Sequence, residues 1–169
     1  MSEQRRDNIL VTMNKSKAPI TGSKLAKKFN VSRQVVVQDI AILRAAGFDI
    51  IATPRGYMMP GASQPRPSCV MAVKHNHAQI GDELMSIVDL GGKVLDVIIE
   101  HPIYGEYKGS LQLSSPSDVR AYMKVMDKND AEPLSALTEG IHLHTVEADT
   151  IEILDAIEKV LMDKGYLLK

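Results

Sequence analysis

The 169-residue sequence predicts an α+β protein, with an N-terminal winged helix-turn-helix joined to a C-terminal two-layer α/β sandwich. Three observations lead to this prediction. Basic residues gather in the first 60 positions, a proline-rich segment follows, and strand-like and helix-like segments alternate after it. The order βαββαβα in the second part favours an antiparallel sheet with its helices on one face.

The charges divide the chain into two parts. Residues 1–60 carry ten Lys/Arg and four Asp/Glu, whereas residues 61–169 carry ten Lys/Arg and seventeen Asp/Glu. A net of +6 therefore precedes a net of −7, and a basic segment of this kind is typical of a part that binds a polyanion. Chance clustering is the alternative that charge alone leaves open.

A linker separates the two parts. The stretch Pro60–Ser68 holds three prolines in nine residues. Proline lacks a backbone donor and disfavours a helix at the residue before it, so we expect an extended segment. We therefore predict a first domain over residues 1–60, a linker over 61–68 and a second domain over 69–169.

The first domain is predicted to hold three helices and a hairpin. An apolar stripe over roughly residues 4–15 indicates the first helix, Thr21 is placed to cap a short second helix, and Ser32 a third. Gly47 ends the third helix. Residues 50–59 are typical of a strand, a turn and a strand.

The second domain is predicted to alternate strands and helices, with Gly91 and Gly92 as a stop and Pro116 early in a helix. Strands are expected at residues 69–74, 94–100, 108–113 and 141–146. Helices are expected at residues 79–90, from residue 115 onward, and at residues 151–162.

The short helix, the turn and the Ser-capped helix form a helix-turn-helix, whose second helix enters the DNA major groove with its N-terminal residues at base edges. Val36, Ile40 and Leu43 turn inward, so the opposite face carries side chains suited to guanine, adenine and thymine. The two helices and the hairpin tip supply the candidate DNA contacts, which are Thr21, Lys24, Ser32, Arg33, Gln34, Val37, Gln38 and Arg55. The alternative is that they are ordinary solvated side chains.

Two histidines indicate a metal site. His142 and His144 are two apart in a predicted strand, so both side chains lie on one face and can chelate a divalent ion. A further ligand must come from elsewhere. By spacing, His75 and His77 are equally good candidates for this ligand. Glu83, on the following helix, is a candidate carboxylate ligand. A mixed nitrogen and oxygen set suits nickel, zinc, iron or manganese.

The segment from Ile20 to Tyr57 resembles the winged helix of the biotin repressor type, although the chain lacks that ligase's biotin-adenylate loop. A fuller resemblance, over nearly the whole chain, is to bacterial niacin-responsive repressors, which pair such a winged helix with a three-histidine (3H) regulatory domain. Its most specific strings are His101–Glu106, HPIYGE, and Leu137–Thr145, LTEGIHLHT. Further matching segments are Ser32–Val35, Val37–Ile40, Ile50–Thr53, Glu83–Leu84 and Ile87–Asp89.

The resemblance implies the site residues. The family pattern puts a ligand histidine eight residues before the glutamate, which selects His75 over His77. The implied ligands of one divalent transition-metal ion per chain are His75, Glu83, His142 and His144. The resemblance also implies nicotinic acid as the effector, and we expect His101 and Tyr104 in the pocket that adjoins the ion.

The expected function is that of a homodimeric, metal-dependent repressor. It binds double-stranded operator DNA with nicotinic acid as co-repressor and controls niacin salvage and transport genes. Three alternatives stay open: a repressor with another carboxylate effector, a small metalloenzyme fused to a DNA-binding domain, and a purely structural metal site. No nucleophile–base string, phosphate loop or acid–base pair is found, so we expect no enzymatic activity.

The amino-acid composition indicates the cell compartment in which we expect the protein. No apolar run reaches the ~18 residues that a membrane span requires, and the N-terminus lacks the apolar core of a secretory signal. The single cysteine, Cys69, forms no internal disulfide and fits a reducing compartment. We therefore expect a cytoplasmic protein without a membrane partner.

Overall fold

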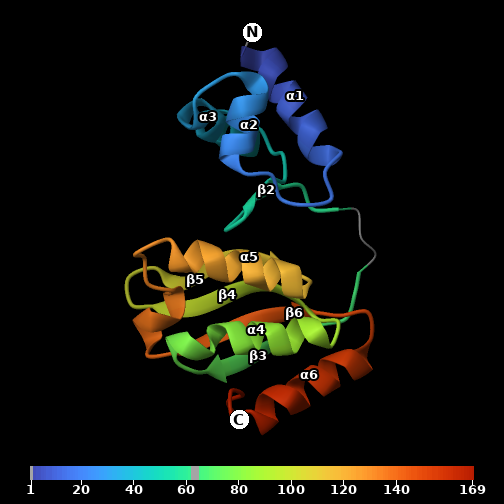
Figure 1. The fold of residues 1–169 in the computed structure, drawn as a ribbon, viewed down its shortest axis with the longest axis vertical. Helices are drawn as coiled ribbons and strands as arrows, with labels where there is room; N and C mark the ends of the chain where they lie inside the picture. Colours follow the sequence, from blue (N-terminus) through green and yellow to red (C-terminus); the bar gives the residue numbers. More distant parts are fainter. Residues whose placement is uncertain (1, 62–64) are drawn as a thin grey trace. The chain divides into compact units, whose positions relative to one another are not determined.

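The computed structural model describes residues 2–61 and 65–169, which belong to two compact units, Met1–Ser63 and Gln64–Lys169 (Figure 1). The predicted linker over 61–68 falls partly on residues 62–64, and that part lies outside the described residues. The last linker position, Ser68, already begins a strand.

The first unit holds the three helices and the hairpin that the sequence predicts. Its elements are α1 (Ser2–Asn14), α2 (Gly22–Phe29), α3 (Arg33–Ala45), β1 (Ile51–Thr53) and β2 (Gly56–Met58). Thr21 Oγ1 accepts the Lys24 backbone N–H and Ser32 Oγ accepts that of Val35, both at 3.2 Å, so each residue caps a helix. Gly47 follows α3 with φ +92°, which favours glycine.

A small core fixes the helix-turn-helix. Its buried residues come from all three helices and from the approach to β1: Ile9, Leu10, Met13, Leu25, Ala26, Val36, Ile40, Leu43 and Ile50. An ion pair between Arg5 Nε and the buried Asp39 Oδ2, at 2.6 Å, joins α1 to α3. The β1–β2 hairpin, here called the wing, is held by two backbone hydrogen bonds between Ile20 and Tyr57.

The second unit is an antiparallel sheet with helices on one face, as predicted. Its strands are β3 (Ser68–Lys74), β4 (Lys93–His101), β5 (Gly105–Leu113) and β6 (Ile141–Glu147). Its helices are α4 (Ile80–Asp89), α5 (Pro116–Asp127) and α6 (Ile151–Asp163), with two short 3₁₀ helices, η1 (His77–Gln79) and η2 (Leu134–Thr138). The strand order is β3-β6-β4-β5, so the last strand in the chain pairs between two earlier ones.

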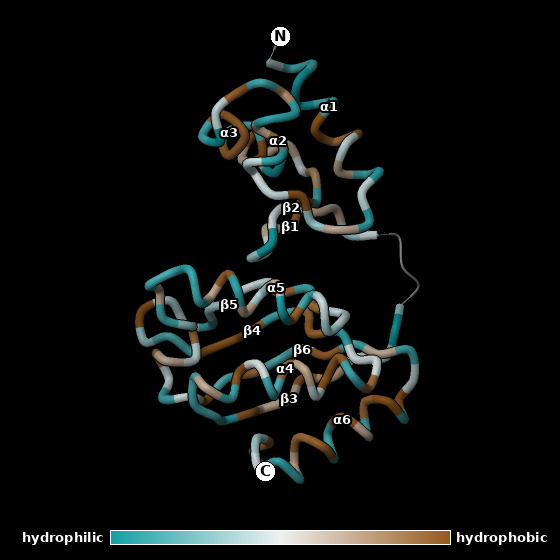
Figure 2. Tube along the Cα trace, viewed as in Figure 1, coloured by the Kyte–Doolittle hydropathy of each residue, from teal (hydrophilic) through white to brown (hydrophobic). Residues whose placement is uncertain are grey.

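One core joins the sheet to its helices. Leu84 and Ile87 of α4, Val119 of α5 and Leu154 and Ile157 of α6 belong to the same buried cluster as the inward residues of the strands. Apolar segments of the sheet and helices face one another in this unit (Figure 2). Among the described residues, none of the helices is long and apolar enough to cross a membrane.

Candidate metal centre and DNA-binding face

Four polar side chains meet inside the second unit: His75 after β3, Glu83 on α4, and His142 and His144 on β6. Glu83 Oε2 lies 2.6 Å from His75 Nε2, 3.7 Å from His142 Nε2 and 3.4 Å from His144 Nε2. All four residues are buried. The three carboxylate–imidazole approaches therefore surround one point that is shielded from solvent.

The other ring nitrogen of each histidine is held by the backbone. The carbonyl partners of Nδ1 are Asn76 for His75, Gly140 for His142 and Asp96 for His144. Because a carbonyl only accepts, each Nδ1 donates its proton, and in the neutral ring each Nε2 carries a lone pair. Three lone pairs and a carboxylate then face one another, an arrangement that requires a proton or a cation among them.

Burial and mutual contact shift the pKa values in this cluster. Burial alone would raise the pKa of Glu83, but the field of His144 and hydrogen bonds with the three imidazoles hold it well below its usual range. Burial alone would lower the pKa of His75 and His144, but their contacts with Glu83 raise both. Glu83 is therefore ionised, and Glu83 Oε1 is buried without a hydrogen-bond partner among the described residues.

Gly140 brings two of the histidines together. Its φ is +87°, and a β-carbon there would overlap the carbonyl oxygen of His75. The His75 backbone N–H donates to the Gly140 carbonyl, which also accepts from His142 Nδ1. The close approach that glycine permits thus places His75 beside the start of β6.

Aromatic residues pack around the cluster. The Tyr166 ring lies edge-on to His75, with centroids 5.5 Å apart, and its hydroxyl donates to Asp82 Oδ2 at 2.7 Å. That hydrogen bond raises the pKa of Tyr166 to about 12. Tyr122 lines a cavity of about 30 Å³ beside the histidines, enough for a water molecule.

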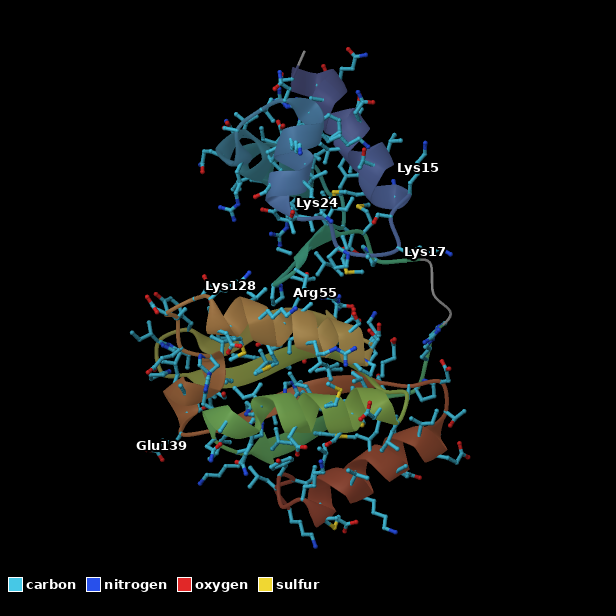
Figure 3. The ribbon with its side chains drawn as sticks, in the orientation of Figure 1. Lys15, Lys17, Lys24, Arg55, Lys128 and Glu139 are labelled. Atoms are coloured by element: carbon cyan, nitrogen blue, oxygen red, sulfur yellow. The ribbon has the colours of Figure 1, made fainter. Side chains whose placement is uncertain are left out.

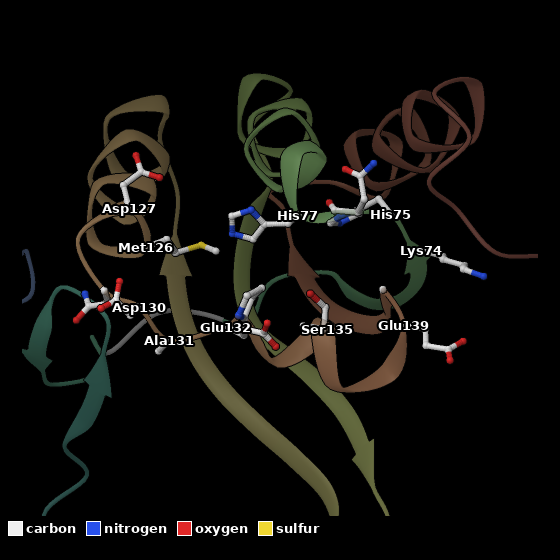
Figure 4. Close-up of a pocket in the computed structure, with 15 residues that line it drawn as sticks. Lys74, His75, His77, Met126, Asp127, Asp130, Ala131, Glu132, Ser135 and Glu139 are labelled. Carbon is white, nitrogen blue, oxygen red and sulfur yellow. The ribbon is translucent and has the colours of Figure 1, made fainter.

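Two larger pockets adjoin the cluster from different sides. One of about 880 Å³ is lined by His75, His77, Met126 and residues 129–133, and its labelled lining residues are drawn in Figure 4. His77 is exposed and borders this pocket, whereas His75 is buried in the cluster. The structure thus places His75, and not His77, with Glu83.

The second large pocket, of about 740 Å³, lies between the β4–β5 turn and the start of β6. Pro102, Gly105, Ile141 and His142 are among its lining residues. The predicted effector residues, His101 and Tyr104, lie at that turn with ring centroids 5.1 Å apart. Tyr104 is 72% exposed, and neither residue contacts the histidine cluster among the interactions of the described residues. The structure therefore brings the four predicted ligands together, while the predicted effector pair lies apart from them.

The candidate DNA contacts of α3 lie on its outer face. Arg33, Gln34 and Gln38 are exposed and Val37 is half-buried, while Ser32 caps the helix. A β-carbon on Gly22 would lie 3.6 Å from Arg33 Nε, so Arg33 extends along the start of α2. The base-reading positions of a helix-turn-helix are thus free to meet DNA.

The remaining DNA candidates flank this face. Lys24 is exposed on α2, three residues after the cap residue Thr21, and Arg55 is half-buried at the turn of the wing (Figure 3). Lys27 is also exposed on α2. The positively charged side chains on α2 and on the wing are suited to contacts with DNA phosphates.

Sequence reasoning missed the residues that support the metal cluster. Gly140, Tyr166 and Asp96 contact the histidines through backbone, ring and carbonyl atoms. Asp96 did leave a signal, because it is the charged residue within the apolar run Val94–Ile99. A charge within a buried strand favours a specific partner.

Comparisons with known proteins match both units. The model of an HTH domain family covers residues 5–58, and that of the 3H domain family covers residues 68–169. The chain is 42% identical over 167 residues to the probable transcription repressor NiaR of Thermotoga maritima, which covers 99% of this chain and 95% of that protein. It is 41% identical over 172 residues to the transcription repressor NadR of Bacillus subtilis, across 100% and 96% of the two chains.

Proposed function

Since the chain belongs to the niacin-responsive transcription repressor family, as a DNA-binding repressor and not an enzyme, we propose that a metal ion and nicotinic acid control its binding to operator DNA. The convergence of three imidazole Nε2 atoms on the Glu83 carboxylate carries the metal part of this proposal. The family of the chain supports the niacin part. The repressor acts in the cytoplasm, on genes for niacin salvage and transport.

The metal ligands in this proposal are His75, Glu83, His142 and His144. The donor set fits a divalent ion of nickel, zinc, iron or manganese, because imidazole nitrogen and carboxylate oxygen suit all four. The unpartnered Glu83 Oε1 and the facing lone pairs supply negative potential at this point. A bound ion supplies a Lewis-acid position for a carboxylate ligand.

Nicotinic acid offers a carboxylate to the ion and a flat ring to the pocket. The pocket between the β4–β5 turn and β6 reaches His142, and its apolar residues Ile98, Pro102 and Ile141 suit a pyridine ring. His101 and Tyr104, at the same turn, flank the effector in this proposal. Glu100 and Glu106 also line the pocket and repel a free carboxylate, so the ion is needed to attract the effector.

DNA recognition rests on the outer face of α3. Arg33, Gln34, Val37 and Gln38 meet base edges in the proposed complex. Thr21, Lys24 and Ser32 contact the phosphate backbone, and Arg55 reaches the backbone or the minor groove. A homodimer places two such helices on half-sites about 34 Å apart, which multiplies the contacts that one small domain makes.

A structural ion is the second candidate. The cavity beside the histidines holds about 30 Å³, which suits water and not a pyridine ring. An ion in such a closed site stabilises the fold without binding an effector. Under the proposed function, the effector approaches the ion from the 740 Å³ pocket, which shares His142 with this cavity.

Isothermal titration of nicotinic acid distinguishes the two candidates. We expect binding to the Zn²⁺- or Ni²⁺-loaded protein, and much weaker binding after the metal is removed with a chelator. Nicotinamide, which lacks the carboxylate charge, is the matched control and should bind more weakly. An ion that binds tightly, with no heat from nicotinic acid in either form, would favour the structural ion.

A further inference from the structure

Strand β4 is irregular beside the histidines. In its pairing with β6, Val94 faces Val146 and Ile98 faces Leu143. Four steps along β4 therefore match three steps along β6. One extra residue lies in β4 between these pairs, which is a β-bulge.

The pairing of β4 with β5 is irregular at the same place. The register shifts between Val94 and Asp96, and Gln112 on β5 has φ +55°, a left-handed conformation. Non-glycine residues adopt this conformation at a cost, so other contacts must maintain the irregularity. Asp96 lies within the irregular segment of the β4–β6 pairing and ends that of the β4–β5 pairing.

Asp96 makes contacts in three directions. Its Oδ1 accepts the backbone N–H of Thr145 at 2.8 Å, and its Oδ2 forms an ion pair with Lys108 Nζ at 2.9 Å. Its backbone carbonyl accepts a hydrogen bond from the Nδ1–H group of His144. The residue is only 1% exposed, whereas the Lys108 side chain is 53% exposed.

The bulge explains why a carboxylate is needed there. Thr145 directs its N–H to the Asp96 side chain, which takes the place of a strand carbonyl as acceptor. The Asp96 carbonyl is thereby available to His144. A buried carboxylate is costly unless it is paired, and Lys108 and Thr145 supply that pairing.

We propose that Asp96 is a positioning residue of the metal centre, because its buried carboxylate maintains the bulge that aims its own carbonyl at His144 Nδ1. The contact fixes the ring of His144 with Nε2 directed toward Glu83. This proposal rests on the proposed metal site, and it assigns a role to a side chain that does not itself touch the ion.

The first test uses the metal-free protein. Long-range ¹H–¹⁵N spectra at a pH above the imidazole pKa distinguish a ring protonated at Nδ1 from one protonated at Nε2. We expect His144 to carry its proton on Nδ1 in the wild type and in Asp96→Asn, which keeps the Oδ1 acceptor. In Asp96→Ala we expect a mixture of both forms. A His144 protonated on Nε2 in the wild type, or unchanged in Asp96→Ala, would overturn the proposal.

The second test measures Zn²⁺ affinity by competition with a chelator. Loss of a partner of this kind lowers metal affinity about 10- to 100-fold, which we expect for Asp96→Ala, with a smaller loss for Asp96→Asn. Val119→Ala is the matched control, because it removes a buried side chain of the same core from α5, outside the bulge. Its affinity should equal that of the wild type. Equal affinity in Asp96→Ala would contradict the positioning role.

The two tests separate the proposals. A wild type that binds no Zn²⁺ contradicts the metal site, whereas the protonation state of His144 still decides the role of Asp96. Should Asp96→Ala fail to fold, the wild type and Asp96→Asn carry the test. In that case a proton on Nδ1 in both supports the proposal, and a proton on Nε2 in either overturns it.

Discussion

His142 Nε2 and His144 Nε2 lie 3.2 Å apart, with both Nδ1 atoms bound to backbone carbonyls. The strand repeat of two puts the rings on one side of β6, and the carbonyl bonds turn both Nε2 atoms toward the same point. Two lone pairs at this separation repel each other. A proton on one ring, or a cation between the two rings and Glu83, removes the repulsion, and the proposed function assigns a metal ion to this point.

Removal of a ligand should empty the site. We expect His75→Ala, His142→Ala and His144→Ala to retain no ion after dialysis, as measured by elemental analysis, because each loses a nitrogen donor. His77→Ala is the control and should keep about one ion per chain, because His77 is exposed outside the cluster. An empty site in His77→Ala with a full one in His75→Ala would reverse the ligand assignment.

Stability should depend on pH in opposite ways with and without the ion. In the metal-free protein, contact with Glu83 raises the pKa of His75 and His144 above their ordinary value, although burial opposes this. Their contribution is fully present below that ordinary pKa and is lost as the pH rises through the raised values. In the metal-loaded protein, protons compete with the ion for the same nitrogens, so stability falls as the pH is lowered.

Calorimetric unfolding between pH 6 and pH 9 tests this prediction. At a free ion concentration 100 times Kd, the ion should add about 2.7 kcal/mol to the free energy of unfolding, and a chelator should remove this gain. Parallel pH profiles for the two forms would contradict the prediction, because they would show that ion and protons do not share the same nitrogens.

Gly140→Ala should damage the metal site through the backbone. The substitution forces a left-handed residue, at about 1–2 kcal/mol, and also a clash with the carbonyl of His75. We expect a larger loss of stability together with weaker Zn²⁺ binding. Gly165→Ala is the matched control, because Gly165 has φ +75° and nothing within 4 Å of a β-carbon, so only the strain applies.

Chemical denaturation and chelator competition measure the two effects. Unchanged Zn²⁺ affinity in Gly140→Ala would show that the approach of His75 to the start of β6 does not hold the site together. A loss of Zn²⁺ affinity in Gly165→Ala as large as that in Gly140→Ala would also show that this approach does not hold the site together.

The outer face of α3 should determine operator affinity. Arg33→Ala and Gln34→Ala should each weaken operator binding by about 1–3 kcal/mol without changing the unfolding midpoint, because both side chains are exposed. Lys27→Ala should instead weaken specific and non-specific DNA alike and flatten the salt dependence. Fluorescence anisotropy against salt concentration measures both effects. Unchanged operator affinity in both α3 variants would contradict the assignment.

The sequence predicts the helices and strands because each has a local signal. Thr21 and Ser32 are caps with accepted N–H groups, and the apolar stripes of α3 and α6 are the buried ones. The 3₁₀ helix η2 was not predicted, since the segment after α5 carries no apolar period. The strand order was not predicted either, because pairing of β6 between β3 and β4 depends on contacts far apart in the chain.

Part of the metal site could be predicted and part could not. The strand period placed His142 and His144 on one face, and both are buried together. Residue spacing could not decide whether His75 or His77 is the metal ligand, because that choice depends on where β3 ends and on the glycine conformation at position 140. The bulge at Asp96 was not predicted, because the left-handed Gln112 has no local sequence signal.

The most direct test of the account is operator binding by the full chain with and without nicotinic acid, in metal-loaded and metal-free forms. Labelled DNA from upstream of niacin salvage and transport genes is titrated and followed by fluorescence anisotropy, with His142→Ala as the metal-site variant. An effector changes DNA affinity only if it binds two conformations unequally. We predict that nicotinic acid tightens operator binding by the metal-loaded wild type and has no effect on the metal-free protein or on His142→Ala. The same response to nicotinic acid in all three would contradict the account.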